Sequence, residues 1–377
     1  MRKIQSLFLA LLLLPMLALA QQLPTPPALA AKSWLLIESG SGQELASQGA
    51  DNRLEPASLT KLMTAYLTFG ALKQGTIKID QMVPVSQKAW KAEGSRMFIQ
   101  VNTQVKVEDL IKGMIVQSGN DACIALSEAV AGSEENFVQM MNREAQRLGM
   151  KASSFRNSAG LPDPEHYTTA RDLAMLAGAL IRDFPEDYAK YYSIKEFRYN
   201  NITQPNRNRL LWLDPTVDGM KTGHTEAAGY CLISSAKRGP RRLLSVVLGA
   251  ASDAVRAQES LKLLNFGYQF YDAVQLYAKD QPVSALKVWK GKEKTVNAGF
   301  NHDFILAVPK GYAARLKSEL ISQQPLMAPV TAGQVVGTMK VTLDGKPFGE
   351  YPVAAITTVP VAGVFGRAID TMRLWFN

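Results

Sequence analysis

The order in which helical and strand-like segments follow one another constrains the fold of this chain more than any other feature. A strand-like run at residues 33–38 precedes a stretch of helical periodicity between residues 55 and 181. Strand-like runs return between residues 195 and 248, and another helical run follows at residues 260–271. Strands on both sides of a helical block are typical of an α+β domain, because a parallel α/β sheet needs regular alternation of strands and helices. We therefore predict an α+β fold for residues 21–274.

The pattern of the chain changes near residue 275, beyond which nearly every segment is strand-like. Residues 336–343 alternate between apolar and polar side chains, and Asp344-Gly345 follows them as a signal for a hairpin turn. Such a change in pattern indicates a second folding unit with its own core. We predict a separate, small all-β domain over residues 275–362.

Residues 363–377 form the last predicted element, an amphipathic helix. Its apolar face includes Phe365, Met372 and Trp375, whereas Asp370 lies between arginines on the opposite face. A helix of this length extends about 20 Å and is too short to span a bilayer. A large apolar face opposite arginines suits a helix that lies in the membrane interface. A terminal helix docked on the β domain is the alternative.

The first twenty residues have the pattern of a secretory signal peptide. Arg2 and Lys3 give a basic start, an apolar run follows to residue 19, and a small-x-small cleavage pattern ends at Ala20. A membrane anchor is the alternative, but the apolar run is short for a membrane span. We predict an exported protein from which residues 1–20 are removed.

The formal net charge is +9, and the lysines and arginines are scattered rather than grouped in runs. This distribution argues against nucleic acid as a partner and favours an anionic polymer or a membrane surface. The three histidines have no metal-ligand spacing, so we expect neither a metal nor another cofactor. Export would permit a disulfide, but we expect Cys123 and Cys231 to be buried free thiols.

A serine and a lysine three residues apart, Ser58 and Lys61, lie at the start of the first helical segment. Pro56 precedes them, and apolar residues follow at helical spacing. Residues at positions i and i+3 share a helix face. A lysine there can take the proton of a serine nucleophile if burial or a nearby cation keeps the amine neutral. The same turn could also hold a helix-capping serine and a solvated lysine.

Two further motifs follow in the order that would complete such a site. Ser-Gly-Asn at 118–120 interrupts the helical pattern between two predicted helices, and Lys-Thr-Gly at 221–223 directly precedes a strand-like run. Alone, the first would be a turn and the second a loop. Together with the serine and lysine at 58 and 61, they match the three motifs of β-lactamases and penicillin-binding enzymes, with glycine at 119 where those motifs have aspartate.

The residues around these motifs resemble the low-molecular-mass penicillin-binding proteins, the serine D-alanyl-D-alanine carboxypeptidases of the bacterial envelope. The likeness lies in Gln-Ser-Gly-Asn-Asp-Ala at 117–122, Val-Asp-Gly-Met-Lys-Thr-Gly-His-Thr at 217–225 and Ile-Lys-Glu-Phe at 194–197. It extends over essentially the whole chain. It implies a penicillin-binding/β-lactamase-like catalytic domain, with an antiparallel sheet and a helical subdomain, followed by the β domain and the terminal helix.

The resemblance also implies an activity and a location. The enzyme would remove the terminal D-Ala from peptidoglycan pentapeptides in the periplasm, while attached peripherally to the inner membrane by its C-terminal helix. β-Lactams would be its inhibitors.

The resemblance further assigns catalytic roles. Ser58 would attack the carbonyl of the penultimate D-Ala and form an acyl-enzyme. Lys61, kept neutral by Lys221, would take the hydroxyl proton. Ser118 would relay a proton to the leaving amine, and Asn120 would hold Lys61 and the substrate amide by hydrogen bonds.

The remaining residues that the resemblance assigns bind the substrate. Lys221 and Thr222 would meet the terminal carboxylate, and the backbone N–H groups of Ser58 and His224 would form an oxyanion hole. The edge of the following strand would pair with the extended peptide. Two arginines would lie near the carboxylate, with ordinary surface charge as the alternative for both. The expected substrate-binding residues are Lys221, Thr222, Gly223, His224, Thr225, Arg207 and Arg256.

Besides Gly119, an absent sequence separates the chain from penicillin-hydrolysing enzymes. No Glu-x-x-Leu-Asn sequence, which would supply a glutamate to activate the deacylating water, occurs between Ser118 and Lys221. We therefore expect β-lactams to acylate Ser58 and to leave slowly. A D,D-endopeptidase and a catalytically weak, peptidoglycan-binding envelope protein are the alternative functions.

Overall fold

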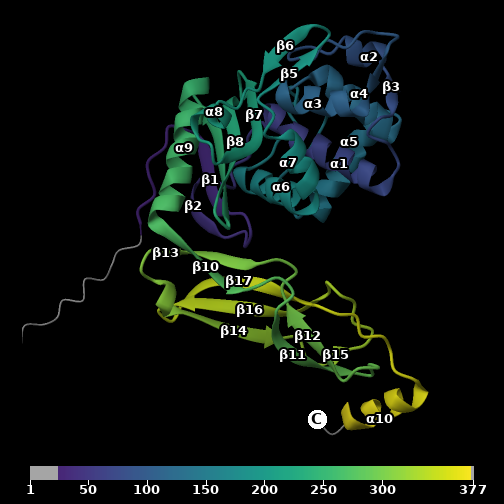
Figure 1. Ribbon diagram of the computed structural model, residues 1–377, viewed down its shortest axis with the longest axis vertical. Helices are drawn as coiled ribbons and strands as arrows, with labels where there is room; N and C mark the ends of the chain where they lie inside the picture. Colours follow the sequence, from purple (N-terminus) through teal and green to yellow (C-terminus); the bar gives the residue numbers. More distant parts are fainter. Residues whose placement is uncertain (1–23, 375–377) are drawn as a thin grey trace, which may run out of the picture.

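The computed structural model describes residues 24–374, which form two domains and a terminal helix (Figure 1). The N-terminal domain combines an antiparallel sheet with helices, and the C-terminal domain consists mainly of strands. Helix α10 (Val364–Leu374) lies at the end of the C-terminal domain that is remote from the first domain. The predicted α+β class is confirmed. The predicted signal peptide and Trp375 lie outside the described residues.

The main sheet of the N-terminal domain has the strand order β2-β1-β9-β8-β7. Its strands are β1 (Ser33–Glu38), β2 (Glu44–Gln48), β7 (Val217–Thr225), β8 (Gly229–Arg238) and β9 (Arg241–Ala250). Two small hairpins are formed by β3 (Met82–Pro84) with β4 (Gln104–Lys106) and by β5 (Glu196–Tyr199) with β6 (Ile202–Pro205). The helices are α1 (Lys61–Gln74), α2 (Gln87–Trp90), α3 (Val107–Val116), α4 (Asn120–Ala131), α5 (Glu134–Arg147), α6 (Ala170–Asp183), α7 (Pro185–Tyr191), α8 (Leu210–Leu213) and α9 (Asp253–Phe270).

Strand β1 is buried on both faces of the sheet, which explains its continuous apolar sequence. Trp34 and Leu36 pack in one core cluster with residues of α9. Leu35 and Ile37 point the other way and pack in a second cluster with α1, α3, α4 and α6. The sheet therefore lies between α9 and the helical block, as Figure 1 shows.

Helix α9 starts earlier than the apolar pattern indicated. We predicted a helix over residues 260–271, but α9 begins at Asp253. The helix begins there because the Ser252 side chain accepts a hydrogen bond from Val255 N at 3.2 Å and caps its first turn. Tyr271 leaves the helix and begins β10, which pairs with β13 of the second domain.

The C-terminal domain contains a six-stranded sheet, with the order β14-β16-β17-β12-β11-β15, and the separate pair β10-β13. The predicted turn at Asp344-Gly345 joins β16 to β17, and both of its residues have positive φ angles, 52° and 77°. The strands are β10 (Tyr271–Tyr277), β11 (Pro282–Trp289), β12 (Thr295–Gly299), β13 (Phe304–Pro309), β14 (Leu316–Ser322), β15 (Leu326–Met327), β16 (Val335–Leu343) and β17 (Lys346–Ala355).

Helix α10 is attached to the C-terminal domain through Asp370, which lies on its predicted polar face. Asp370 is only 3% exposed. Its carboxylate accepts a hydrogen bond from Lys290 N at 2.8 Å and lies 3.2 Å from Lys294 Nζ. On another side of the helix, Phe365 is 87% exposed. Within residues 24–374, no helix has the length and apolar character needed to cross a membrane.

Candidate active site

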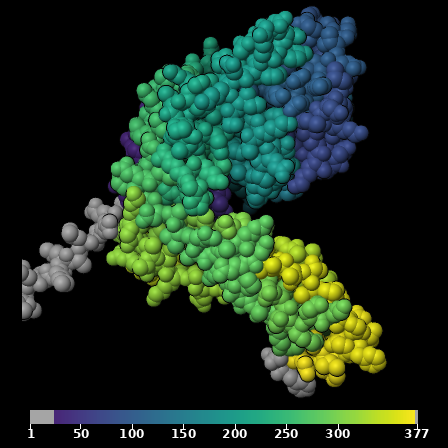
Figure 2. Space-filling view, viewed as in Figure 1, coloured from purple at the N-terminus to yellow at the C-terminus, as the bar shows by residue number. Residues whose placement is uncertain are grey.

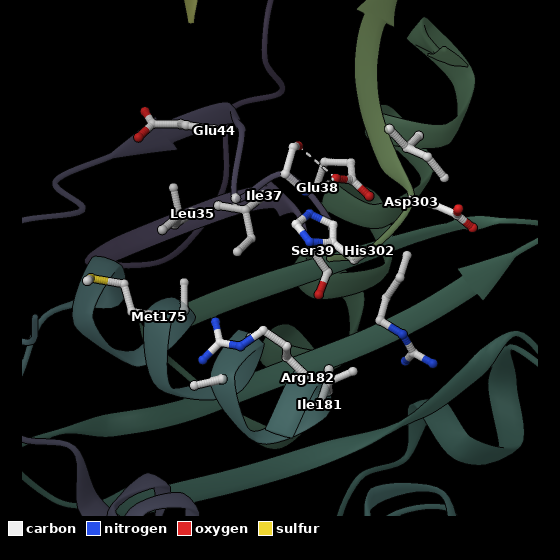
Figure 3. A pocket seen from close by; sticks show the side chains of 18 of the residues that line it. Leu35, Ile37, Glu38, Ser39, Glu44, Met175, Ile181, Arg182, His302 and Asp303 are labelled. Carbon is white, nitrogen blue, oxygen red and sulfur yellow. Dashed lines mark hydrogen bonds between the residues drawn. The ribbon is translucent and has the colours of Figure 1, made fainter. Parts of the chain in front are cut away.

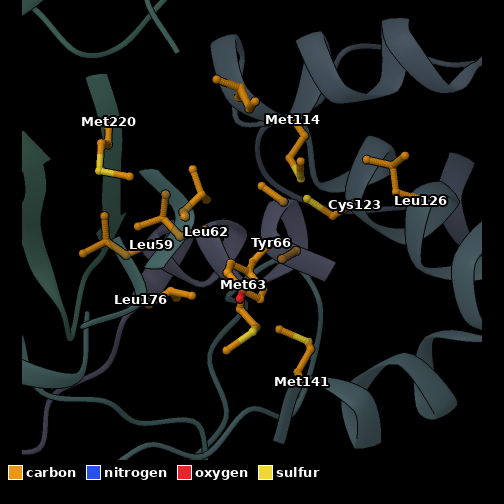
Figure 4. Packing of buried hydrophobic residues seen from close by; sticks show 14 of the residues in the cluster. Leu59, Leu62, Met63, Tyr66, Met114, Cys123, Leu126, Met141, Leu176 and Met220 are labelled. Carbon is orange, nitrogen blue, oxygen red and sulfur yellow. The ribbon is translucent and has the colours of Figure 1, made fainter. Parts of the chain in front are cut away.

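The turn that carries Ser58 is fixed by its apolar neighbours. The 3-10 helix η1 (Ala57–Thr60) leads directly into α1. Leu59 and Met63 are fully buried in the core beside it (Figure 4). Ala57 has a φ of 46°, and strained backbone of this kind persists where the surrounding packing enforces it. The core therefore holds the serine in one position at the start of the helix.

Lys61 is 1% exposed and makes three contacts through Nζ. The nitrogen lies 2.9 Å from Ser58 Oγ, 2.7 Å from Asn120 Oδ1 and 2.6 Å from the carbonyl oxygen of Ala159. Asn120 Nδ2 donates to the carbonyl of Glu93 at 2.6 Å, which turns the amide oxygen toward the lysine. The structure thus brings together the serine and lysine of the first motif and the asparagine of the second.

Burial is the main cause of the lowered pKa of Lys61. It lowers the pKa of Lys61 to about 8, and the Arg207 guanidinium shifts that pKa in the same direction. We expected the charge of Lys221 to be the cause. Burial and then the charges of Lys61 and Arg207 hold the pKa of Lys221 well below the usual lysine value, so each of the two buried amines disfavours the charge of the other. A lysine of this kind can be a general base near neutral pH.

Ser118 lies in the predicted break between α3 and α4. It is buried and has a φ of 61°. Asp121 holds the residues around this break, since its carboxylate accepts hydrogen bonds from Met97 N at 2.9 Å and Phe98 N at 2.8 Å. The break therefore has a fixed shape, and it places Ser118 two residues before the asparagine that contacts Lys61.

Strand β7 carries the Lys-Thr-Gly motif past the nucleophile turn. A Cβ at Gly223 would lie 3.1 Å from the carbonyl oxygen of Pro56 and 3.3 Å from the side chain of Ala57, so this close approach favours glycine. Lys221 and Thr222 are both buried in the same strand. The motif therefore lies against η1, beside the serine.

The end of β7 is anchored by its side chains, while one of its backbone edges has no partner strand within residues 24–374. Thr225 Oγ1 donates to Glu55 Oε2 at 3.2 Å, and the exposed His224 ring packs on Tyr230 with 4.0 Å between ring centres. β7 is the last strand of its sheet, and among the described residues no strand pairs with its outer edge. An extended peptide could add to this edge.

The two predicted arginines differ in their surroundings. Arg207 is exposed, and its charge acts on both Lys61 and Lys221. Arg256 is buried behind β7, where Nη1 donates to the carbonyl oxygen of Gly223 at 3.1 Å and Nη2 pairs with Asp253. Arg256 therefore supports the strand, whereas Arg207 has a guanidinium that faces solvent.

Sequence reasoning missed some groups of this site. No sequence signal could indicate Ala159, because any residue supplies a main-chain carbonyl. Asp121 could have been noticed, since it directly follows the Ser-Gly-Asn motif. Cys123 and Cys231 are buried and free, as predicted. Burial raises the pKa of Cys123 to about 12, so it remains a thiol beside the lysine.

Comparison with known protein families gives two matches. A family model described as D-alanyl-D-alanine carboxypeptidase matches residues 20–252. The chain belongs to the peptidase S11 family of D-alanyl-D-alanine carboxypeptidases. It is therefore a member of a hydrolase family, and the resemblance inferred from the three motifs is confirmed. A second model, described as the C-terminal domain of penicillin-binding protein 5, matches residues 271–361 and accounts for the β domain.

Relatives named D-alanyl-D-alanine carboxypeptidase match nearly the whole chain. D-alanyl-D-alanine carboxypeptidase DacC of Escherichia coli K12 is 44% identical over 366 residues, which cover 95% of this chain and 91% of that protein. D-alanyl-D-alanine carboxypeptidase DacA of Haemophilus influenzae is 41% identical over 357 residues, which cover 93% of this chain and 90% of that protein.

Solved structures of S11 proteins confirm the expected catalytic fold. Penicillin-binding protein 5 from Haemophilus influenzae superposes with a TM-score of 0.79 at 40% identity, covering 89% of this chain and 99% of that chain. Penicillin-binding protein D2 from Listeria monocytogenes, solved in its ampicillin-bound form, superposes with a TM-score of 0.60 at 30% identity and covers 65% of this chain and 100% of that chain.

Proposed function

We propose that this protein is a serine D-alanyl-D-alanine carboxypeptidase that removes the terminal D-Ala of peptidoglycan pentapeptides through an acyl-enzyme on Ser58. The observation that carries the proposal is the buried Lys61 amine, 2.9 Å from the Ser58 hydroxyl oxygen and with a pKa lowered to about 8. A serine hydroxyl is a weak nucleophile until an adjacent base accepts its proton.

The three contacts of Lys61 match the hydrogen-bonding capacity of a neutral amine. The carbonyl oxygens of Asn120 and Ala159 can only accept, so they take the two N–H groups. The nitrogen lone pair is then left for the Ser58 hydroxyl, which can donate. An ammonium would donate to all three oxygens and could not take a proton. Loss of the Lys61 proton therefore prepares the serine for attack.

The reaction then has two steps. Ser58 Oγ bonds to the carbonyl carbon of the penultimate D-Ala while its proton passes to Lys61, and the oxyanion is stabilised by the backbone N–H groups of Ser58 and His224. The peptide bond breaks as Ser118 relays a proton to the leaving nitrogen of the terminal D-Ala. A water molecule then hydrolyses the ester and restores the serine.

The substrate would lie along the free edge of β7. An extended peptide that adds to this edge directs its terminal carboxylate toward the cationic residues beside it. Lys221, Thr222 and the exposed Arg207 would bind that carboxylate, which would favour the protonated form of Lys221. Arg256 would act indirectly, by holding the Gly223 carbonyl and hence the strand.

β-Lactams would acylate the same serine. The relative from Listeria monocytogenes has been solved with ampicillin bound. The missing Glu-x-x-Leu-Asn sequence leaves this chain without the glutamate that class A β-lactamases use for deacylation. We therefore propose a long-lived acyl-enzyme with penicillins.

We also infer export to the periplasm and attachment to the inner membrane. The signal pattern of residues 1–20 supports export. Val364 and Phe365 of α10 are 71% and 87% exposed, and apolar side chains of this size are costly to leave in water. Asp370 holds another side of α10 on the β domain, so these apolar side chains remain free to enter a lipid surface.

Two substrates test the proposed specificity. One is a peptide that ends in D-Ala-D-Ala, and the other is a cross-linked muropeptide dimer. We expect release of free D-Ala from the peptide and little cleavage of the dimer. Monomers formed from the dimer without release of D-Ala would instead assign a D,D-endopeptidase. Binding without cleavage of either would assign a peptidoglycan-binding role.

A further inference from the structure

A cavity of about 660 Å³ lies where the two domains meet. Figure 2 shows that the surface is hollowed between them. The cavity is lined by α6, by the turns β1–β2 and β8–β9, and by the loop that precedes β13. None of the candidate catalytic residues lines it. Its volume is within the range of small-molecule sites, which often occur at domain interfaces.

The domains are joined directly beside this cavity by Gln43. Its side-chain nitrogen donates to the carbonyl oxygen of Ala307 at 2.9 Å, and its side-chain oxygen accepts from Ala307 N at 3.0 Å. The neighbouring residues Gly42 and Glu44 line the cavity. A paired contact between a turn of one domain and a strand of the other fixes the walls, so the cavity exists before any ligand binds.

One wall of the cavity is the outer face of α6. Met175, Gly178 and Ile181 are spaced three residues apart, and the labelled Met175 and Ile181 lie on the same wall in Figure 3. The buried residues of α6 alternate with these and pack into the core. A Cβ at Gly178 would meet no atom within 4 Å. This wall therefore offers an apolar surface with open space above it.

The opposite wall supplies hydrogen-bonding groups. Figure 3 shows His302 and Ser39 facing the wall of α6 across the cavity. Burial and the charge of Arg182 lower the pKa of His302, so its ring is neutral. Lys237 also lines the cavity and makes no ion pair within residues 24–374. By contrast, each arginine of the lining is already paired with a carboxylate. These arginines are Arg147, Arg171, Arg182 and Arg242.

The carboxylates of the lining already accept hydrogen bonds or ion pairs from other groups of the protein. Glu38 accepts hydrogen bonds from Ser41 N at 2.6 Å and Ser41 Oγ at 2.7 Å. Glu44 is paired with a lining arginine. Asp303 accepts from Lys279 N at 2.9 Å. The exposed ammonium of Lys237, which has no carboxylate partner among residues 24–374, is therefore the charge that a ligand would meet.

We propose that this cavity is a binding site for a small organic acid with an apolar body. Its anionic group is held by Lys237, and its apolar part lies on the outer face of α6 over Gly178. The site is separate from the proposed reaction and does not depend on it. Its contacts come from both domains, so the ligand also binds them together.

The probe for this site is 8-anilinonaphthalene-1-sulfonate, an organic acid with an apolar body whose fluorescence rises on binding. The full chain is titrated as wild type, as Gly178→Trp, which fills the open space, and as Gly178→Ala, which leaves most of it. Lys237→Glu reverses the uncompensated charge, and Lys310→Glu makes the same change at an exposed lysine outside the cavity. Labelling of Ser58 by a fluorescent penicillin checks that each variant is folded.

We expect one saturable site in the wild type. Gly178→Trp should weaken it by about tenfold or more, and Lys237→Glu by about threefold or more, whereas Gly178→Ala and Lys310→Glu should bind like the wild type. Penicillin labelling should be equal in all variants. Equal affinity of wild type and Gly178→Trp would place the probe on another surface and overturn the proposal. Absence of saturable binding by the wild type would overturn it as well.

Discussion

The Nζ of Lys61, a residue that is 1% exposed, and the Oγ of the half-buried Ser58 lie 2.9 Å apart. The two remaining contacts of the amine are to oxygens that cannot donate a hydrogen bond. Burial favours the neutral amine over the ammonium, and in the neutral amine two N–H groups meet these oxygens while the lone pair is left for the serine. The predictions below follow from it and from the contacts of β7 and α10.

Replacement of Lys61 by methionine removes the base and keeps a side chain of similar length. We expect the second-order rate constant for acylation by benzylpenicillin to fall by about 10²–10⁴-fold, the usual contribution of general base catalysis. Stopped-flow or gel-based acylation assays measure the constant, and circular dichroism checks the fold. Acylation of a folded K61M variant at the wild-type rate would show that another group accepts the proton.

The rate of acylation should rise with pH through the pKa of Lys61, near 8. Burial disfavours the charged form, so the pKa is lowered from 10.5, and the active neutral amine increases as pH rises. Between these two values the unfolded chain binds more protons than the folded one, so the free energy of unfolding should also rise with pH there. A pH profile of acylation between 6 and 9 that is flat or falling would contradict the assignment.

Replacement of Asn120 by aspartate places a negative charge 2.7 Å from Lys61 Nζ. An opposite charge at this distance stabilises the ammonium and raises the pKa of the lysine. The pH profile of acylation should therefore move to higher pH by about 1 unit or more, with a lower rate at pH 7. Asn120→Ala is the control, because it removes the contact without adding charge. A profile of N120D that moves to lower pH would be inconsistent with a lysine base.

Gly223 should tolerate a side chain poorly, because an added Cβ lies 3.1 Å from Pro56 O and 3.3 Å from the Ala57 side chain, closer than most such contacts. We expect Gly223→Val to push β7 away from the nucleophile turn and to slow acylation by about tenfold or more, since small misplacements of reacting groups are costly. Gly178→Val is the matched control, because a Cβ at Gly178 would meet no atom within 4 Å. Equal acylation rates in G223V and the control would show that the approach of β7 is not needed.

Replacement of Asp370 by alanine should release α10 from the β domain. The variant loses the hydrogen bond to Lys290 N and the contact with Lys294. We expect faster proteolysis within α10, which mass spectrometry of the fragments would locate, and an unchanged rate of penicillin acylation at the distant active site. Asp344→Ala, at an exposed ion pair of the same domain, is the control. Equal proteolysis of both variants would mean that Asp370 does not hold the helix.

The sequence predicted those parts of the fold that depend on local pattern. The continuous apolar run of β1 and the Asp344-Gly345 turn each have a short-range cause, and both are present. The start of α9 was missed because the prediction followed apolar spacing and overlooked the cap at Ser252. The partners of Asp370 could not be predicted, because a helical pattern gives the side of a residue but not the neighbour that covers it.

The candidate site could be predicted as a set of motifs but not as a set of contacts. The spacing of Ser58 and Lys61 within one turn was sufficient to place them together. The sequence could not show how strongly burial lowers the pKa of the lysine, since burial depends on the whole packed core. Nor could it show that Arg256 is engaged by the Gly223 carbonyl, because that bond joins α9 to β7.

The most direct test of the account is the release of D-Ala from a peptide that ends in D-Ala-D-Ala, measured for the wild type and for Ser58→Ala. We predict release by the wild type and none above background by S58A, with intact mass spectrometry showing a benzylpenicillin adduct on the wild type alone. Release of D-Ala by a folded S58A variant at a rate similar to the wild type would contradict the assignment of Ser58 as the nucleophile.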